Sequence, residues 1–234
     1  MRASAPVAPF RTALRHDTVQ VIAELKRRSP SKGVINETLD APTRARTYTE
    51  AGAAALSVLT EPSQFGGSLE DLQAVHAVTP LPLLRKDFIV DEIQLLEARA
   101  FGASAVLLIA RGLPPEQFRI LAHAALDMGL DLLLEVRDEA ELDRALEVPH
   151  AVIGVNNRNL ETLVMDDGVS ARLLPRIPTD RIAVYESGVT DRAAVERAGA
   201  LGADAVLVGS SLSASSDARA ALAALLGVRR HSRG

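Results

Sequence analysis

Short runs of apolar residues recur along the chain, and stretches with polar and apolar residues at helical spacing separate them. One cassette, a glycine followed by small and branched apolar residues, begins at Gly52, Gly102 and Gly202, and a looser copy begins at Gly129. Glycine suits the left-handed residue that ends a helix, and the apolar run suits a strand buried on both faces. The repeat therefore predicts successive helix–strand units.

Four further apolar runs, at residues 21–26, 81–84, 151–156 and 182–186, bring the number of predicted strands to about eight, spaced roughly 20 to 33 residues apart. The intervening stretches Asp91–Ala100 and Asp191–Ala200 have helical periodicity and begin with an acidic residue, which the helix dipole favours. Such alternation predicts a parallel sheet, and eight units in this length favour a closed (β/α)8 TIM barrel over an open doubly wound sheet.

The chain has the length of one domain, and no linker or low-complexity segment divides it. We expect a short N-terminal extension over residues 1–20, the (β/α)8 barrel over residues 21–228, and a frayed, solvated tail over residues 229–234.

Composition narrows the class of function. A net charge of −4 and an aromatic content of 3% argue against a nucleic-acid partner. The chain contains no cysteine, which excludes disulfides and thiolate metal sites and is compatible with a reducing compartment. No signal sequence or membrane-spanning stretch is recognisable. We expect a cytoplasmic protein that is a monomer or weak homodimer.

Polar residues follow the predicted strands at their carboxyl ends, where enzymes with this barrel have their active sites. These residues are Glu24, Lys26, Lys86, Glu135, Asn156, Arg158, Glu186, Ser187, Gly209 and Ser210. One such residue alone is typical of a solvated loop, but six strands that end in this way indicate a common site. Lysines and glutamates that converge on one rim can shift each other's pKa towards neutrality, as acid–base catalysis requires.

Two features concern ligands. Gly188, Gly209 and Ser210 follow the seventh and eighth strands, where these barrels often bind phosphate through backbone N–H groups. The segment Ser29–Gly33 fits a turn better than a second phosphate contact. No histidine lies at a predicted strand end, and no motif for a nucleotide cofactor occurs, so we expect neither a metal nor a cofactor. The pair Asp166-Asp167, which has no partners at metal-binding spacing, is interpreted as a helix N-terminal cap.

Several blocks of the sequence resemble the indole-3-glycerol phosphate synthase family, and they extend in order from about Val21 to Leu212. They are Ile22-Ala23-Glu24-Leu25-Lys26-Arg27-Arg28-Ser29-Pro30-Ser31-Lys32-Gly33, Leu84-Arg85-Lys86-Asp87-Phe88-Ile89, Leu133-Leu134-Glu135-Val136, Ile153-Gly154-Val155-Asn156-Asn157-Arg158-Asn159-Leu160 and Tyr185-Glu186-Ser187-Gly188-Val189. The first two blocks are long and specific.

The resemblance implies ring closure of an anthranilate-substituted deoxyribulose phosphate, with release of carbon dioxide and water. By this analogy Lys86 is the general acid of ring closure, Glu135 and Lys26 are base and acid of the dehydration, and Glu24 orients the lysines. Asn156, Glu186 and Ser187 are expected to shape the site. The expected substrate-binding residues are Ser29, Gly188, Gly209 and Ser210 at the phosphate, Phe65, Phe88 and Leu107 at the aromatic ring, and Arg158.

Departures from the family pattern and two alternatives accompany this resemblance. The segment before the first strand is shorter than is usual in the family, and we expect Pro9–Leu14 to be the remnant of a helix near the substrate. Tyr185 is larger than the small residue expected there. One alternative is another phosphosugar barrel such as phosphoribosylanthranilate isomerase, although its usual cysteine is absent. The other is a catalytically silent barrel that binds a phosphate ligand, although each expected catalytic position is filled.

Overall fold

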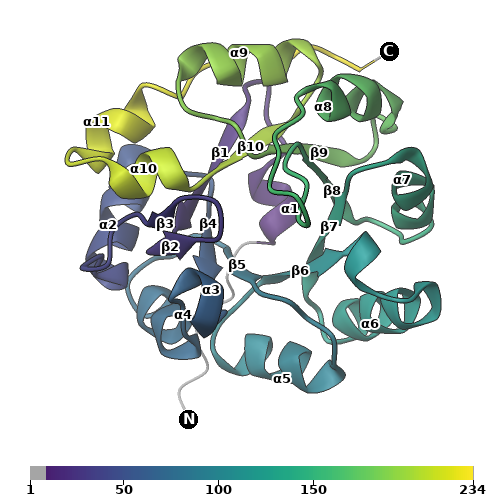
Figure 1. The fold of residues 1–234 in the computed structure, drawn as a ribbon, viewed down its shortest axis with the longest axis horizontal. Coiled ribbons are helices and arrows are strands. Elements are labelled where there is room, and N and C mark those ends of the chain that lie inside the picture. Colours follow the sequence, from purple (N-terminus) through teal and green to yellow (C-terminus); the bar gives the residue numbers. More distant parts are fainter. Residues whose placement is uncertain (1–8, 234) are drawn as a thin grey trace.

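The structure is a computed structural model and describes residues 9–233. Within this range eight parallel strands close into a barrel, which confirms the predicted (β/α)8 fold (Figure 1). The barrel strands are β1 (Gln20–Leu25), β4 (Ala55–Leu59), β5 (Leu83–Lys86), β6 (Ala105–Ile109), β7 (Asp131–Val136), β8 (Val152–Asn156), β9 (Ile182–Glu186) and β10 (Ala205–Val208). Each pairs with its neighbours along the chain, and β1 closes the ring against β10 and β4.

Helices surround the barrel (Figure 1). They are α2 (Ala41–Ala51), α3 (Pro62–Phe65), α4 (Leu69–His76), α5 (Glu92–Ala100), α6 (Pro115–Asp127), α7 (Glu139–Leu146), α8 (Gly168–Leu173), α9 (Arg192–Ala200), α10 (Ser210–Ala214) and α11 (Ala218–Ala223), with the 3-10 turns η1 (Ala110–Gly112) and η2 (Leu174–Arg176). The four cassette glycines all have positive φ angles between 70° and 98°, as the repeat predicted. Asp91 and Asp191 cap α5 and α9, at the acidic helix starts that the sequence indicated. Asp167 occupies the predicted cap position of α8 without a capping hydrogen bond from its side chain, and Asp166 instead accepts one of 3.0 Å from the N–H of Gly168.

The apolar side chains form two layers, because successive strand residues face opposite sides of the sheet. One layer packs between the strands and the helices, and the other fills the barrel, with Ile22, Leu133 and Val184 among its members. Both faces of every barrel strand are therefore buried, which explains why the strands read as unbroken apolar runs.

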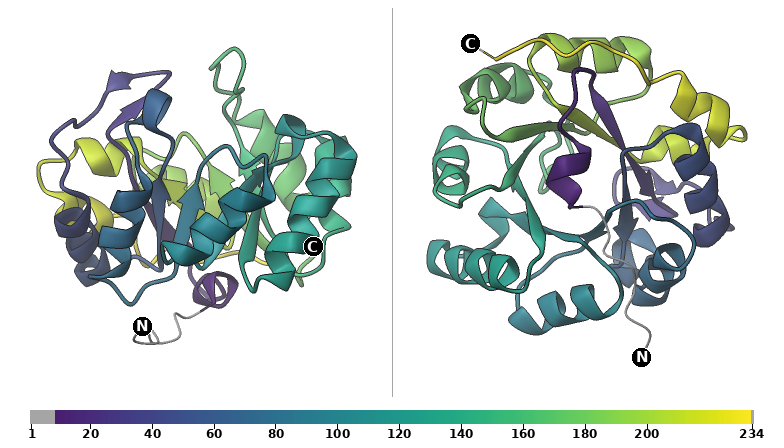
Figure 2. Two further views of the ribbon diagram at one scale, coloured as in Figure 1. Left: turned by 90° about the horizontal axis from the view of Figure 1, so that it is seen from below. Right: turned by 180° about the vertical axis from the view of Figure 1, so that it is seen from behind.

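The N-terminal helix α1 (Phe10–Ala13) closes the end of the barrel at which the strands begin (Figure 2). Phe10 and Leu14 are completely buried there and complete the apolar filling of the barrel. The backbone N–H of Arg11 donates to Asp131, the first residue of β7. The expectation that Pro9–Leu14 lies near the substrate is therefore wrong, because this apolar segment seals the opposite mouth.

The C-terminal tail is not frayed over residues 229–233, in contrast to the expectation. Arg229 pairs with Thr18, and only 6% of Arg233 is exposed. The buried carboxylate of Asp204 forms ion pairs with Arg230 at 2.6 Å and with Arg233 at 2.8 Å. A buried carboxylate requires such partners. Asp204, which directly precedes β10, thereby holds the tail against the barrel.

The segment after β1 forms a small hairpin of β2 (Arg28–Ser29) and β3 (Gly33–Val34), which confirms the predicted turn. The hairpin stands above the carboxyl ends of the barrel strands, on the side opposite α1 (Figure 2). Among the described residues, no helix combines the length and the apolar character needed to cross a membrane.

Candidate active site

A cavity of about 430 Å³ opens at the carboxyl ends of the barrel strands. All of the predicted site residues line it: Glu24, Lys26, Ser29, Phe65, Lys86, Phe88, Leu107, Glu135, Asn156, Arg158, Glu186, Ser187, Gly188, Gly209 and Ser210. They come from six of the barrel strands, β1 and β5 to β9, and from the segments that follow β1, β4, β5, β8, β9 and β10. Closure of the barrel brings together residues that are far apart in the sequence.

Lys86, the last residue of β5, carries the central charge of the cavity. Its Nζ lies 3.6 Å from Oε2 of Glu135 and 3.8 Å from Oε2 of Glu186. Burial alone would lower the pKa of Lys86, but the carboxylates of Glu135 and Glu186 outweigh it and raise the pKa above its usual value. Lys86 is therefore an ammonium ion throughout the neutral pH range.

Lys26 and Glu24 form a second pair beside it, with 2.5 Å between Nζ and Oε1. Ser57 donates a hydrogen bond of 3.3 Å to the other oxygen of Glu24. Burial works to raise the pKa of Glu24, but Lys26 and Lys86 more than compensate, so the pKa is lowered. Gly209 leaves the space that this carboxylate occupies, because a Cβ at position 209 would overlap it.

Glu186 differs from the other carboxylates of the site. It is 2% exposed, and burial together with the charge of Glu135 raises its pKa to about 8, in spite of Lys86. Its Oε1 has no hydrogen-bond partner and lies where a Cβ of residue 154 would be, so only glycine at Gly154 allows this position. Glu186 therefore holds a proton at neutral pH and can donate it in a hydrogen bond.

The raised pKa of Glu186 predicts how stability depends on pH. Between its ordinary value of 4.5 and about 8, the folded protein keeps a proton that the unfolded chain has lost. Stability therefore falls as pH rises through this window and levels off above it. A pKa raised by a single pH unit costs ~1.4 kcal/mol, or about 3–5 °C in Tm for a domain of this size. Glu186→Gln, which stays neutral, should gain at least about 3 °C over the native protein between pH 5 and pH 9.

Thermal unfolding at pH 5, 7 and 9 measures this difference. The matched control is Glu70→Gln on the exposed side of α4, for which the difference from the native protein should stay constant with pH. A Tm difference for Glu186→Gln that does not change with pH would contradict the proposed burial of a protonated carboxyl group.

Backbone geometry fixes the polar side chains after β8 and β9. Ser187 donates a hydrogen bond of 2.8 Å to Oδ1 of Asn156, which also accepts one of 2.9 Å from the N–H of Arg158. Ser187 and Gly188 have φ angles of 67° and 83°, so the chain turns sharply after β9. Such a left-handed conformation is unusual for serine, and the bond to Asn156 helps to maintain it.

One wall of the cavity is aromatic. The rings of Phe65 and Phe88 are 6.2 Å apart and tilted by 48°, and the ammonium group of Lys26 lies 5.9 Å from the centre of the Phe65 ring. Leu107 of β6 lines the cavity as well. This wall suits a flat aromatic ligand next to the charged groups.

The loop that connects β8 to α8 contributes cavity residues that were not predicted from the sequence. Leu160, Leu163 and Met165 of this loop line the cavity, and the guanidinium of Arg158 donates a hydrogen bond of 2.9 Å to the carbonyl oxygen of Leu163. Three apolar residues in a loop without helical or strand periodicity were the available signal. Arg158 thus stabilises this loop in addition to lining the cavity.

The cavity combines lysine ammonium groups, carboxylates and an aromatic wall with glycine and serine residues. Among residues 9–233, no cluster of histidine, aspartate and glutamate side chains is arranged to hold a metal ion. The arrangement can bind an aromatic anion, donate protons from two lysines and remove one with a carboxylate.

Comparisons with known proteins agree with this chemistry. The family model described as "Indole-3-glycerol phosphate synthase" matches residues 1–225. An indole-3-glycerol phosphate synthase of Nocardioides sp. is 47% identical over 97% of this chain and 88% of its own length. One of Kineococcus radiotolerans is also 47% identical, over 91% of this chain and 78% of its own length.

The fold is shared more widely. The structure of 3-hexulose-6-phosphate synthase from Salmonella typhimurium superposes with a TM-score of 0.67 and 14% identity, and it covers 88% of this chain and 96% of that chain. This structural similarity supports only the barrel fold, whereas the sequence matches show the family. The chain belongs to the indole-3-glycerol phosphate synthase family.

Proposed function

We propose that Lys86, held between Glu135 and Glu186, is the general acid of the ring-closing reaction in this cavity. The chain has indole-3-glycerol phosphate synthase activity, a decarboxylating lyase reaction of tryptophan biosynthesis that acts on a small phosphosugar. The observation that supports the role of Lys86 is its position inside the cavity as an ammonium group that carries its proton at neutral pH.

The reaction converts 1-(2-carboxyphenylamino)-1-deoxyribulose 5-phosphate to indole-3-glycerol phosphate. The ring carbon that bears the carboxylate attacks the ketone carbon, and the ketone oxygen takes up a proton. The carbon–carboxylate bond then breaks, its electron pair returns to the aromatic ring, and carbon dioxide leaves. Finally the new hydroxyl group leaves as water with an added proton, and loss of a C–H proton completes the indole.

We assign the first proton to Lys86. A neutral ketone is a weak electrophile, and a proton donor that is already in place stabilises the negative charge that develops on its oxygen. Glu135 and Glu186 fix the direction of the ammonium group from two sides. Glu186, whose pKa is raised to about 8, can offer a bound ligand a neutral hydrogen-bond donor, and the hydrogen-bonded pair of Asn156 and Ser187 shapes the site with it.

Glu135 and Lys26 are assigned to the dehydration. Glu135 is 3% exposed, and as a carboxylate it can accept the C–H proton, while Lys26 donates the proton that the hydroxyl group takes with it. Glu24 holds Lys26 through the 2.5 Å ion pair and thus orients this acid. Each turnover uses two protons, one from Lys86 and one from Lys26, and returns one to Glu135. Solvent supplies the net proton, which takes the place of the carboxylate lost as carbon dioxide.

The rest of the cavity binds the substrate at its two ends. Ser29, Gly188, Gly209 and Ser210 are assigned to the phosphate, and Phe65, Phe88 and Leu107 to the aromatic ring. Arg158, which follows β8, is assigned to substrate binding and faces the same cavity. Binding at both ends holds the reacting carbons together, which is the main entropic contribution to a ring closure.

We propose further that the protein acts in the cytoplasm as a monomer or weak homodimer, without nucleic acid or membrane partners. The net charge of −4 and the lack of cysteine support this setting.

The direct test is turnover of the purified chain. Addition of 1-(2-carboxyphenylamino)-1-deoxyribulose 5-phosphate should give indole fluorescence with a kcat on the order of 1–10 s⁻¹, unchanged by EDTA. A folded protein that binds the substrate without forming product would support the catalytically silent barrel instead.

A further inference from the structure

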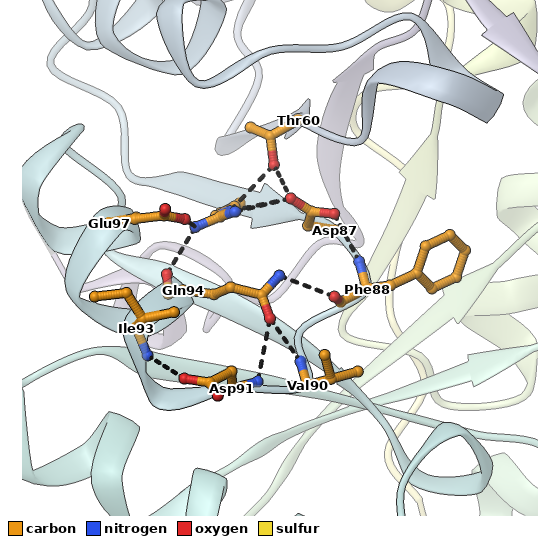
Figure 3. Close-up of polar contacts among 9 residues, drawn as sticks. Thr60, Asp87, Phe88, Val90, Asp91, Ile93, Gln94 and Glu97 are labelled. Atoms are coloured by element: carbon orange, nitrogen blue, oxygen red, sulfur yellow. Dashed lines mark hydrogen bonds and ion pairs between the residues drawn. The ribbon is translucent and has the colours of Figure 1, made fainter.

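The loop between β5 and α5 carries Phe88 into the cavity and has no regular secondary structure of its own. A dense set of hydrogen bonds holds it, shown in Figure 3 around Thr60, Asp87 and Gln94. The acid–base chemistry described above uses none of these bonds, so they require a separate explanation.

Arg85 is the buried centre of this set, with 3% of its surface exposed. It precedes Lys86 on β5, so its side chain points to the opposite face of the strand, away from the barrel interior. Its guanidinium donates to Oγ1 of Thr60 at 3.1 Å, to Oδ2 of Asp87 at 2.9 Å and to the carbonyl oxygen of Gln94 at 2.7 Å. An ion pair of 3.1 Å with Glu97 completes its contacts. Arg85 therefore connects the end of β4, the loop and the first turn of α5.

Asp87 and Gln94, which Arg85 contacts, in turn hold the backbone of Phe88 by hydrogen bonds (Figure 3). Oδ1 of Asp87 accepts a hydrogen bond of 2.8 Å from the N–H of Phe88, and Nε2 of Gln94 donates one of 3.0 Å to its carbonyl oxygen. Oε1 of Gln94 accepts two more bonds, from the N–H groups of Val90 at 2.8 Å and Asp91 at 3.1 Å. The amide of one side chain thus satisfies three backbone groups of the loop.

The ring of Phe88 has little other support. Phe88 is 47% exposed, and its nearest aromatic neighbour is Phe65 at 6.2 Å. Because neighbouring side chains do not enclose the ring, its position depends on the conformation of the Phe88 backbone. The hydrogen bonds to this backbone therefore determine where the ring lies. The position of Lys86 does not depend on Gln94, because Lys86 pairs with Leu59 of β4 within the barrel sheet.

We propose that Gln94, fixed by Arg85, is a positioning residue that holds Phe88 as a preformed aromatic wall and thereby sets affinity for the substrate rather than the rate of the chemical step. This inference rests on the proposed function, in which Phe88 contacts the aromatic ring of the substrate. A preformed wall spares the ordering cost that binding would otherwise include.

The test is a double-mutant cycle of Gln94→Met and Phe88→Ala. Gln94→Met keeps the length of the side chain and removes all three hydrogen bonds. It should raise KM, and the Kd of the product indole-3-glycerol phosphate, about tenfold, equivalent to ~1.4 kcal/mol, and change kcat less than about twofold. In the Phe88→Ala background it should change neither constant by more than about twofold, because no ring is left to position.

Gln117→Met is the matched control, since Gln117 donates to the same loop but only to the carbonyl oxygen of Val90, at 2.5 Å. It should leave KM within about twofold of the native value. Gln94→Glu is a second variant, because it keeps the acceptor for Val90 and Asp91 but replaces the donor to Phe88 by a carboxylate oxygen that repels its carbonyl oxygen. It should raise KM at least as much as Gln94→Met if the bond to Phe88 is the one that matters.

Three results would overturn the inference while leaving the proposed function intact. They are a similar rise of KM on Gln94→Met in both backgrounds, a loss of kcat at unchanged KM, and a rise of KM in Phe88→Ala but not in Gln94→Met. If Phe88→Ala leaves KM and Kd unchanged although the native protein turns over, the aromatic-wall assignment itself is wrong, and the inference fails with it.

Discussion

Lys86→Met is expected to lower kcat at least about 100-fold with the fold intact, because it removes the proton donor of ring closure. Methionine has nearly the length of lysine and fits a largely buried position between Glu135 and Glu186. The ammonium group is one of the charges that lower the pKa of Glu186, so without it this pKa should rise further and Glu186 should stay protonated beside Glu135. The ligand-binding residues are untouched, so KM should change much less than kcat.

Initial rates of indole fluorescence measure this loss. Lys32→Met is the matched control, because it removes the same charge from the exposed rim of the cavity and should leave kcat within about threefold of the native value. Near-native turnover of Lys86→Met would remove Lys86 from the mechanism.

Glu135→Gln is expected to lower kcat about 100-fold as well, but at a later step. Glutamine has the shape of glutamate and cannot accept the C–H proton whose loss forms the indole. Ring closure and decarboxylation need no base, so they should survive. The change also removes the charge that helps raise the pKa of Glu186.

Rapid quenching of the reaction should therefore reveal an intermediate that has lost the carboxylate but keeps the hydroxyl group. Glu139→Gln at the start of α7, where the side chain is half-buried at the surface, is the control, and it should show native kinetics. Native turnover of Glu135→Gln would assign the base to another group.

The barrel could be predicted because its units repeat. Each cassette couples a glycine that ends a helix to a strand buried on both faces, and both features are local in the sequence. The site residues could be located because they directly follow strands whose carboxyl ends meet in one rim. The family resemblance added the proposed roles of Lys86 and Glu135.

Features that depend on distant partners could not be predicted. The tail appeared frayed because nothing near Arg233 in the sequence reveals Asp204, which binds it. Helix α1 was expected near the substrate, yet its apolar residues Phe10 and Leu14 fill the other mouth of the barrel. Gln94 resembles any polar residue of an amphipathic helix, and only the structure shows its three hydrogen bonds to the loop.

Two glycines illustrate the same limit within the site. Gly154 lies inside an apolar strand and Gly209 in a strand–helix turn, and neither position reveals a carboxylate in the sequence. In the barrel each faces a buried glutamate, Glu186 and Glu24 respectively, at a distance that excludes a Cβ. The shape of the acid–base site therefore depends on the lack of a side chain at these two glycines as well as on the charged side chains.

The central claim is that Lys86 serves ring closure and Glu135 serves dehydration in one cavity. Single-turnover release of labelled carbon dioxide, followed beside indole fluorescence in Lys86→Met and Glu135→Gln, tests it most directly. We predict that Lys86→Met slows both signals equally, whereas Glu135→Gln releases carbon dioxide well before indole appears. Equal slowing of both signals in Glu135→Gln, or rapid release of carbon dioxide by Lys86→Met, would contradict this division of roles.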